Sequence, residues 1–582
     1  MRRVLARLRS RQASYSTTDY HLLGHDDAQI EKRDDTETSV SDVDSYDLRP
    51  YPEQRSRWRV EGVILRLLRS LKILLPSFLH ASEPKNDVRK LRPTAWLDGL
   101  RGVAALCVVL HHMSLIWFSW SIHDGWQWPT PSTAPESPSR SLLIQLPLVR
   151  LFISGPANVM LFFAVSGYAL SLKPLTLMRS GEISKAYQSL ASATFRRHPR
   201  LFLPPLFICA PAALVAFWGG YDPGAIPVSW TAGGSEDTAG GEGLAIEGMI
   251  PNAAIHPMNP PRFDTFAAQL TDFLHTLLAR ADPYTPDGGP WAYSDSLWTL
   301  PIEFRGSLVI FALLFAVAKC TRRARLVITG AVAVYSWWFF HWGEFLFVAG
   351  VLVAEVGVGR GQRLAQPQQR QRQHLGVWRE DENDSERESG ELTTVHRGKK
   401  RFTSLNIPRV LRRLNRVAGI LAFIAALFVL SMPEQSRGAS DSWGFEALNT
   451  LIPERFHAAA AADSFWQPLA AIAVVLAVDL SPLVQSVFTT RFALYLGRIS
   501  FALYLVHMLI LHSLGFRLGL YVLTEITGYD TPLRYGMGVG IAGVVTGFVI
   551  FWAADLGARF VDENVVRFTG WAYSSLCTKE SD

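Results

Sequence analysis

The chain has 582 residues, of which 49% are hydrophobic and only 19% are charged, and its formal net charge is +6. Soluble proteins carry about a quarter of charged residues, so this composition excludes an ordinary soluble enzyme and favours an all-α polytopic membrane protein. The basic residues lie beside apolar runs and do not form a stripe interleaved with exposed aromatics, so we expect membrane lipids, and no nucleic acid, as partners. Four scattered cysteines have neither disulfide-framework nor zinc spacing, so no metal is expected: Cys107, Cys209, Cys320 and Cys577.

The first ninety residues precede the apolar runs. Residues 1–56 are polar, and their composition predicts a disordered cytosolic tail. Residues 57–92 contain a basic amphipathic pattern from Arg57 to His80 followed by a linker. This pattern predicts either a helix on the membrane surface or a helix packed within the domain.

Ten apolar runs follow, with lengths that suit a helix crossing a hydrocarbon core of about 30 Å. They divide the membrane domain into residues 93–359 and 416–560, separated by a polar cytosolic insert at 360–415 and followed by a cytosolic tail at 561–582. A Gly- and Pro-rich lumenal loop, 220–296, contains an amphipathic helix pattern at Phe266–Arg280. The predicted spans are 97–119, 151–173, 201–219, 297–318, 325–341, 343–359, 416–432, 464–482, 493–516 and 534–557.

The loops between these spans alternate in charge. Every second loop is rich in Arg and Lys, whereas the loop 220–296 carries mainly acidic residues. The positive-inside rule therefore predicts an even number of spans with both termini in the cytosol, without indicating which organelle holds the protein.

The first span carries ionisable residues that are costly in a bilayer and are therefore candidates for a functional site. Arg101 and His112 are eleven residues apart, which places them on one helix face about 16 Å apart along the axis. Arg101 suits an anionic ligand, and His112 suits proton transfer. Two plainer interpretations stay open: Arg101 marks the cytosolic end of the span, and His112 is a buried histidine bonded to a carbonyl. His111 points about 100° away and is the poorer candidate.

Other spans bring further polar groups. Arg197 and Arg200 form a fork suited to phosphates, or are simply positive-inside charge. Glu303 lies within the fourth span, where it can act as a base, orient a histidine or pair with an arginine. Tyr504 and His507 are one turn apart in the ninth span.

Five motifs in order resemble the acyltransferase 3 family of multipass membrane acyltransferases, from about Leu97 to Asp555. They are "LDGLRGVAALCVVLHH", "FFAVSGYAL", "RRHPRL", "SLWTLPIEF" and "ISFALYLVH". The resemblance implies transfer of an acyl group, often acetyl, from acyl-CoA to a hydroxyl of a carbohydrate, lipid or natural product, without a permanently bound cofactor. By the same resemblance, His112 and Glu303 are catalytic, Arg101, Arg197 and Arg200 bind the CoA phosphates, and Tyr504 and His507 bind substrate.

The sequence leaves the mechanism and the class of protein partly open. His112 can deprotonate the acceptor hydroxyl directly, or take the acyl group itself before handing it on. A proton-coupled transporter is the main alternative, because Arg, Glu and His inside a membrane also form relays, although no internal repeat supports it. A receptor or scaffold that has lost catalysis is the third possibility.

Overall fold

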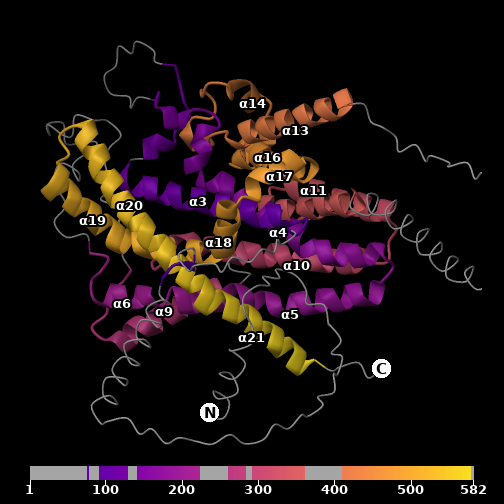
Figure 1. The fold of residues 1–582 in the computed structure, drawn as a ribbon, viewed down its shortest axis with the longest axis horizontal. Coiled ribbons are helices and arrows are strands. Elements are labelled where there is room, and N and C mark those ends of the chain that lie inside the picture. The colour runs from indigo at the N-terminus through magenta and orange to yellow at the C-terminus, as the bar shows by residue number, and fades with distance from the viewer. Residues whose placement is uncertain are drawn as a thin grey trace, which may run out of the picture. The chain divides into compact units, whose positions relative to one another are not determined.

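The computed structural model describes residues 75–77, 91–118, 120–128, 140–222, 260–282, 291–360 and 409–577 (Figure 1). The chain divides into two compact units, Met1–Arg66 and Leu67–Asp582, and all of these residues belong to the second. The predicted tail at 1–56, most of the segment 57–92 and nearly all of the insert 360–415 lie outside the described residues.

The described residues are helical and contain no strand, which confirms the all-α prediction. Short 3-10 turns join several of the helices, and three π-helical segments interrupt the last third of the chain. The principal helices are α3 (Ala95–Trp117), α4 (Gly155–Arg179), α5 (Ile183–Ile208), α6 (Pro211–Phe217), α9 (Phe266–Arg280), α10 (Thr299–Val317), α11 (Arg322–Trp338), an unlabelled helix (Trp342–Arg360), α13 (Arg409–Leu430), α14 (Glu446–Thr450), α16 (Asp463–Leu480), α17 (Pro482–Phe488), α18 (Arg491–Ile510), α19 (Phe516–Tyr521), α20 (Pro532–Gly557) and α21 (Glu563–Leu576).

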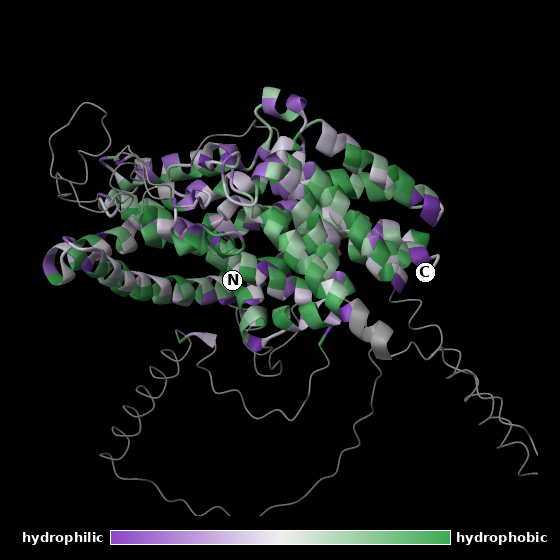
Figure 2. Ribbon diagram, turned by 90° about the horizontal axis from the view of Figure 1, so that it is seen from above, coloured by the Kyte–Doolittle hydropathy of each residue, from purple (hydrophilic) through white to green (hydrophobic). Residues whose placement is uncertain are grey.

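Eight helices in the described part of the chain are long and apolar enough to cross a membrane, so the predicted count of ten is approximate. Two predicted spans, 325–341 and 416–432, are not among these eight, because their apolar helical parts are too short to cross a membrane. The α11 helix has 17 residues, which rise only about 25 Å, and the apolar part of α13 is limited to Arg416–Leu430. Figure 2 shows the apolar residues running along the helices and the hydrophilic ones gathering toward their ends and connections.

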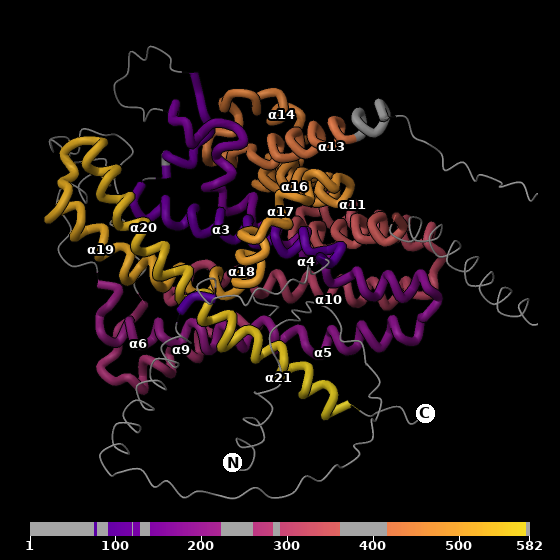
Figure 3. Tube along the Cα trace, viewed as in Figure 1, coloured from indigo at the N-terminus to yellow at the C-terminus, as the bar shows by residue number. Residues whose placement is uncertain are grey.

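Several membrane helices extend beyond their predicted limits, and two of them do so most. The third begins at Ile183 rather than near residue 201, because the polar first half of α5 continues without interruption into its apolar second half. The last continues from α20 through a π-helical turn, Ala558–Asp562, into α21, so that one long run covers Pro532–Leu576 (Figure 3). Residues 563–576 of the predicted cytosolic tail are therefore helical, and α21 packs against α5 through Phe195 and Tyr573.

The central contact of the fold joins α3, the first membrane helix, to α18, and α18 also packs against α20 (Figure 1). On its other side α3 contacts α4, which in turn contacts α5, α10 and α16. Two hydrophobic clusters surround these contacts, one centred on α4 and the helix Trp342–Arg360 and the other on α18 and α20. The α3–α18 pair therefore lies where the two halves of the membrane domain meet.

The predicted amphipathic helix in the loop 220–296 is present as α9, with the predicted bounds. Its buried residues are Gln269, Phe273 and Leu277, which recur every four positions on one face. Gln269 donates a hydrogen bond to the hydroxyl of Tyr293, and Tyr293 donates to Asp272, so the helix is tied to the segment that leads into α10.

Candidate functional site

Glycines allow α3 to approach α18, and the preceding α17, at backbone distance. A Cβ atom added to Gly102 would lie 2.2 Å from the backbone nitrogen of Gly497, and one added to Gly99 would lie 1.7 Å from the carbonyl oxygen of Phe488. Only small residues permit such an approach between membrane helices. One guanidinium nitrogen of Arg101 donates to the carbonyl of Gly497 at 2.9 Å, while its Nε is buried without a hydrogen-bond partner among the described residues. The "LDGLRG" motif thus sets the helix contact and places Arg101 at it.

His112 lies eleven residues after Arg101 on α3 and faces α18. Its ring centroid is 5.1 Å from that of His507, and the His507 ring is 5.8 Å from that of Tyr504. The Tyr504 hydroxyl donates to the carbonyl of Ser296 and lies 2.6 Å from Oγ1 of Thr299. The structure therefore brings the predicted residues of the first and ninth spans together at the entry to α10.

His111 has a structural position, as its orientation on the helix predicts. Its Nδ1 is 2.7 Å from the carbonyl oxygen of Ile153, and its ring packs edge-on against His123 with centroids 4.8 Å apart. A Cβ atom on Gly155 would lie 2.5 Å from the His111 ring, so this glycine makes room for it. The plainer interpretation that we left open for His112, a histidine bonded to a carbonyl, applies to His111 instead.

Arg197 and Glu303 form a second group on α5 and α10. A guanidinium nitrogen of Arg197 is 2.8 Å from Oε1 of Glu303, and its Nε donates to the Ser307 hydroxyl at 2.8 Å. Ser307 itself donates to the carbonyl of Glu303, one turn earlier on α10. Arg197 is only 8% exposed, so its charge is balanced mainly by this carboxylate.

The remaining predicted cations belong to the same charged group. The positive charges of Arg101 and Arg200 each repel that of Arg197. Both also attract the carboxylate of Asp562. Asp562 was not among our predicted residues, because the segment after 560 was expected to be a tail rather than a helix packed on α5. The group carries three positive charges against the two carboxylates of Glu303 and Asp562.

Tyr504 lies between the charged group and the histidine pair. Its hydroxyl is close enough to Glu303 to interact with the charge of that carboxylate, and its ring packs near His507. Phe162 of the predicted "FFAVSGYAL" motif lies beside it, with centroids 6.5 Å apart. In the same motif, Gly167 lets α4 approach the backbone of Phe347, the structural role that small residues indicate. The described residues contain no group of three or more His, Cys, Asp or Glu side chains arranged to hold a metal ion.

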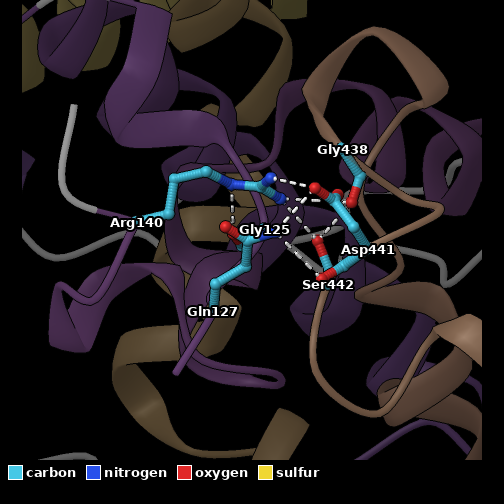
Figure 4. Close-up of polar contacts among 6 residues, drawn as sticks. All are labelled: Gly125, Gln127, Arg140, Gly438, Asp441 and Ser442. Atoms are coloured by element: carbon cyan, nitrogen blue, oxygen red, sulfur yellow. Dashed lines mark hydrogen bonds and ion pairs between the residues drawn. The ribbon is translucent and has the colours of Figure 1, made fainter. Parts of the chain in front are cut away.

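Two connecting segments that are distant in sequence, one with Gly125 and Arg140 and the other at residues 437–442, meet at the Arg140 side chain (Figure 4). Arg140 reaches between them, donating to the carbonyls of Gly125 and Gly438, to the Asp441 carboxylate at 2.8 Å and to the Ser442 hydroxyl at 3.0 Å.

The guanidinium of Arg437 in the second segment lies over the Trp120 ring at 4.6 Å, and Trp120 in turn contacts His111. Arg437 and Arg140 were not predicted, since nothing in a single sequence pairs these two loops.

The comparisons with known proteins identify the family of the chain. A family model described as an acyltransferase domain matches residues 94–553. An O-acetyltransferase, PaAT-1 of Phomopsis amygdali, is 34% identical over 525 residues, which cover 88% of this chain and 90% of the relative. Acyltransferase R4 of a Phoma species is 24% identical (81% and 93% covered), and acyltransferase clz18 of Cochliobolus lunatus is 23% identical (84% and 97% covered). No solved structure matches the chain.

Proposed function

The chain belongs to the acyltransferase 3 family, and from that premise we propose that it transfers an acetyl group from acetyl-CoA to a hydroxyl group of a small molecule, glycan or lipid. The observation that carries this proposal is that α3 holds Arg101, a member of a largely buried cationic group, at one level and His112, a member of a histidine pair, at another. The printed name of the relative from Phomopsis amygdali, an O-acetyltransferase, supports both acetyl as the group and oxygen as the acceptor atom.

The cationic group suits the polyanionic end of the donor. Arg101, Arg197 and Arg200 would bind the phosphates of CoA, because guanidinium groups pair with phosphate oxygens in a bidentate manner. Glu303 holds Arg197 at 2.8 Å, so in place of the catalytic role that the family resemblance implies we assign to this carboxylate the positioning of a phosphate-binding arginine. The unpartnered Nε of Arg101 is a further donor available to a ligand.

The histidine pair suits the chemical step. His112 lies three helical turns from Arg101, about 16 Å along an uninterrupted α3. The pantetheine arm of CoA bridges that distance, so phosphates at Arg101 would bring the thioester to His112. His112 would then carry the proton that the acceptor hydroxyl gives up and the leaving thiolate takes. Tyr504 would bind substrate, because its oxygen keeps a free lone pair beside Thr299 and Ser296.

The charge pattern of the loops supports the geometry across the membrane. Arg-rich loops support a cytosolic position for the cationic group, where acyl-CoA is present, with both termini in the cytosol. The acceptor would approach from the opposite, lumenal side, past Trp120 and the loop pair joined by Arg140. Membership of an acyltransferase family favours this enzyme over the proton-coupled transporter.

The test uses purified protein in liposomes with radiolabelled acetyl-CoA, and compares wild type with His112→Ala and Arg197→Ala. We expect Arg197→Ala to weaken donor binding by about 10-fold to 100-fold, the range for a lost charged hydrogen bond. We expect His112→Ala to bind donor normally and to lose turnover by about 100-fold or more. The matched control is Arg323→Ala on α11, an exposed arginine outside this group. Wild-type turnover in His112→Ala would reject the proposal.

A further inference from the structure

The proton of His507 has a fixed position. Nδ1 of this ring is 3.2 Å from the carbonyl oxygen of Leu503, one turn earlier on α18. A carbonyl oxygen only accepts, so Nδ1 must carry the proton, and the lone pair of the neutral ring is then on Nε2.

That Nε2 is buried and has no hydrogen-bond partner among the described residues, and the His507 side chain is 0% exposed. Buried polar atoms are almost always paired, so an unpaired one calls for an explanation such as a bound water, an ion or a catalytic role. His507 therefore offers an oriented, water-shielded base next to His112.

His112 is arranged differently. No hydrogen bond to a described residue fixes which of its nitrogens carries the proton, and its side chain is only half-buried. A ring with an unfixed proton can receive a proton on one nitrogen and release one from the other, as a relay does. The two rings, 5.1 Å apart between centroids, are close enough for transfer directly or through one water.

We propose that His507 is a catalytic residue whose Nε2 takes the proton from the acceptor hydroxyl, and that His112 passes this proton on to the sulfur of CoA. This inference rests on the proposed acetyl transfer. It divides the proton transfer of that reaction between His507 and His112. It changes the role expected for His507 from substrate binding to catalysis.

The step balances without any further reactant. The acceptor oxygen forms a bond to the thioester carbonyl carbon while its O–H bond breaks and the proton moves to Nε2 of His507. The C–S bond breaks and leaves a thiolate, the proton moves from His507 to His112, and His112 protonates the sulfur. The products are the O-acetyl ester and free CoA thiol, and both histidines are neutral again.

The geometry also orders the two substrates. His112 shares α3 with Arg101, so the donor sulfur lies on the His112 side. Tyr504 lies beside His507 and is hydrogen-bonded to Thr299 and Ser296, and the proposal puts the acceptor hydroxyl next to these three residues. The proposal thus assigns one substrate to each histidine, as a proton bridge between oxygen and sulfur requires.

The test measures release of CoA thiol with two simple nucleophiles, water alone and added glycerol, together with binding of acetyl-CoA. His507→Asn keeps an amide near Nδ1 and removes Nε2, whereas His507→Gln places an amide without a basic lone pair near Nε2. His275→Gln, an exposed position on α9, is the matched control. Normal acetyl-CoA binding shows that a variant is folded.

We expect both His507 variants to bind acetyl-CoA as wild type does and to lose about 100-fold or more of kcat with water and with glycerol, without a matching rise in the KM for glycerol. Adding His112→Ala to either variant should cost little more, because consecutive steps of one transfer are not additive.

Hydrolysis at the wild-type rate, or recovery of kcat at high glycerol, would overturn the inference and leave His507 as a binding residue. Absence of thiol release from wild type that binds acetyl-CoA would instead count against the proposed function, and the inference would fall with it.

Discussion

Replacing Gly102 by alanine tests whether the approach of α3 to α18 controls the site. The added Cβ would lie 2.2 Å from the backbone nitrogen of Gly497, where ordinary contacts begin at 3.4 Å, so the helices would have to separate by about 1.2 Å. Backbone atoms of a packed helix cannot rotate away as a flexible side chain does. The separation would lengthen the 2.9 Å bond from Arg101 to Gly497 and the 5.1 Å spacing of His112 and His507 together.

The expected size of the effect follows from this displacement. A misplacement of about 1 Å at a reacting centre costs on the order of 100-fold in rate, and overpacking a core costs about 1–3 kcal/mol of stability. Gly102→Ala should therefore lower kcat for thiol release by about 100-fold and lower the unfolding temperature in detergent.

The control is Gly547→Ala on α20, where an added Cβ meets nothing within 4 Å. Because alanine favours a helix over glycine by up to about 1 kcal/mol, this variant should be at least as stable as wild type and fully active. If Gly102→Ala matched Gly547→Ala in both measurements, close contact between the two helices would not be what positions the site.

Three further predictions concern stability. Burial, with the nearby His111 ring and the charge of Arg150, lowers the pKa of His123 to about 2, so the folded protein resists a proton that the unfolded chain accepts near pH 6.5. The free energy of unfolding should therefore decrease as the pH drops below 6.5, by up to about 1.4 kcal/mol per pH unit from this group. His123→Asn should flatten the slope of unfolding temperature against pH between 6.5 and 5, and an unchanged slope would contradict the argument. Glu355→Gln removes the buried carboxylate that three arginines share, Arg325 at 3.1 Å among them, and should cost about 3–5 kcal/mol in thermal unfolding, whereas the exposed Glu446→Gln should change little. Arg140→Ala removes four hydrogen bonds, three of which join the two loops, and should speed proteolysis at these loops several-fold; equal cleavage of variant and wild type would show that the bonds do not hold the loops together.

The sequence was sufficient to predict the all-α class and the apolar parts of the membrane helices. Apolar runs of fixed length mark membrane helices, and the bounds of α9 follow from a four-residue repeat of its buried face. The ends were harder to place where polar residues continue a helix, as at the start of α5 and in α21. Hydropathy alone cannot distinguish a polar helix packed on another helix from a tail.

The site could be predicted residue by residue but not pair by pair. Intramembrane charge identified Arg101, Arg197 and Glu303, yet only the structure shows that Glu303 is bound to Arg197 and not to a histidine. Asp562 was missed because its partners lie on helices far away in sequence. The orientation of His507 depends on a backbone carbonyl, which no pattern of side chains reveals.

The central claim is that one helix, α3, holds the donor phosphates at one level and the reacting thioester at another. A cryo-electron microscopy structure of the protein with a thioether analogue of acetyl-CoA tests this claim directly. Our account predicts phosphate density against Arg101, Arg197 and Arg200, and the acetyl carbonyl beside His112 and His507. Phosphates bound elsewhere, or an acetyl group far from both histidines, would contradict it.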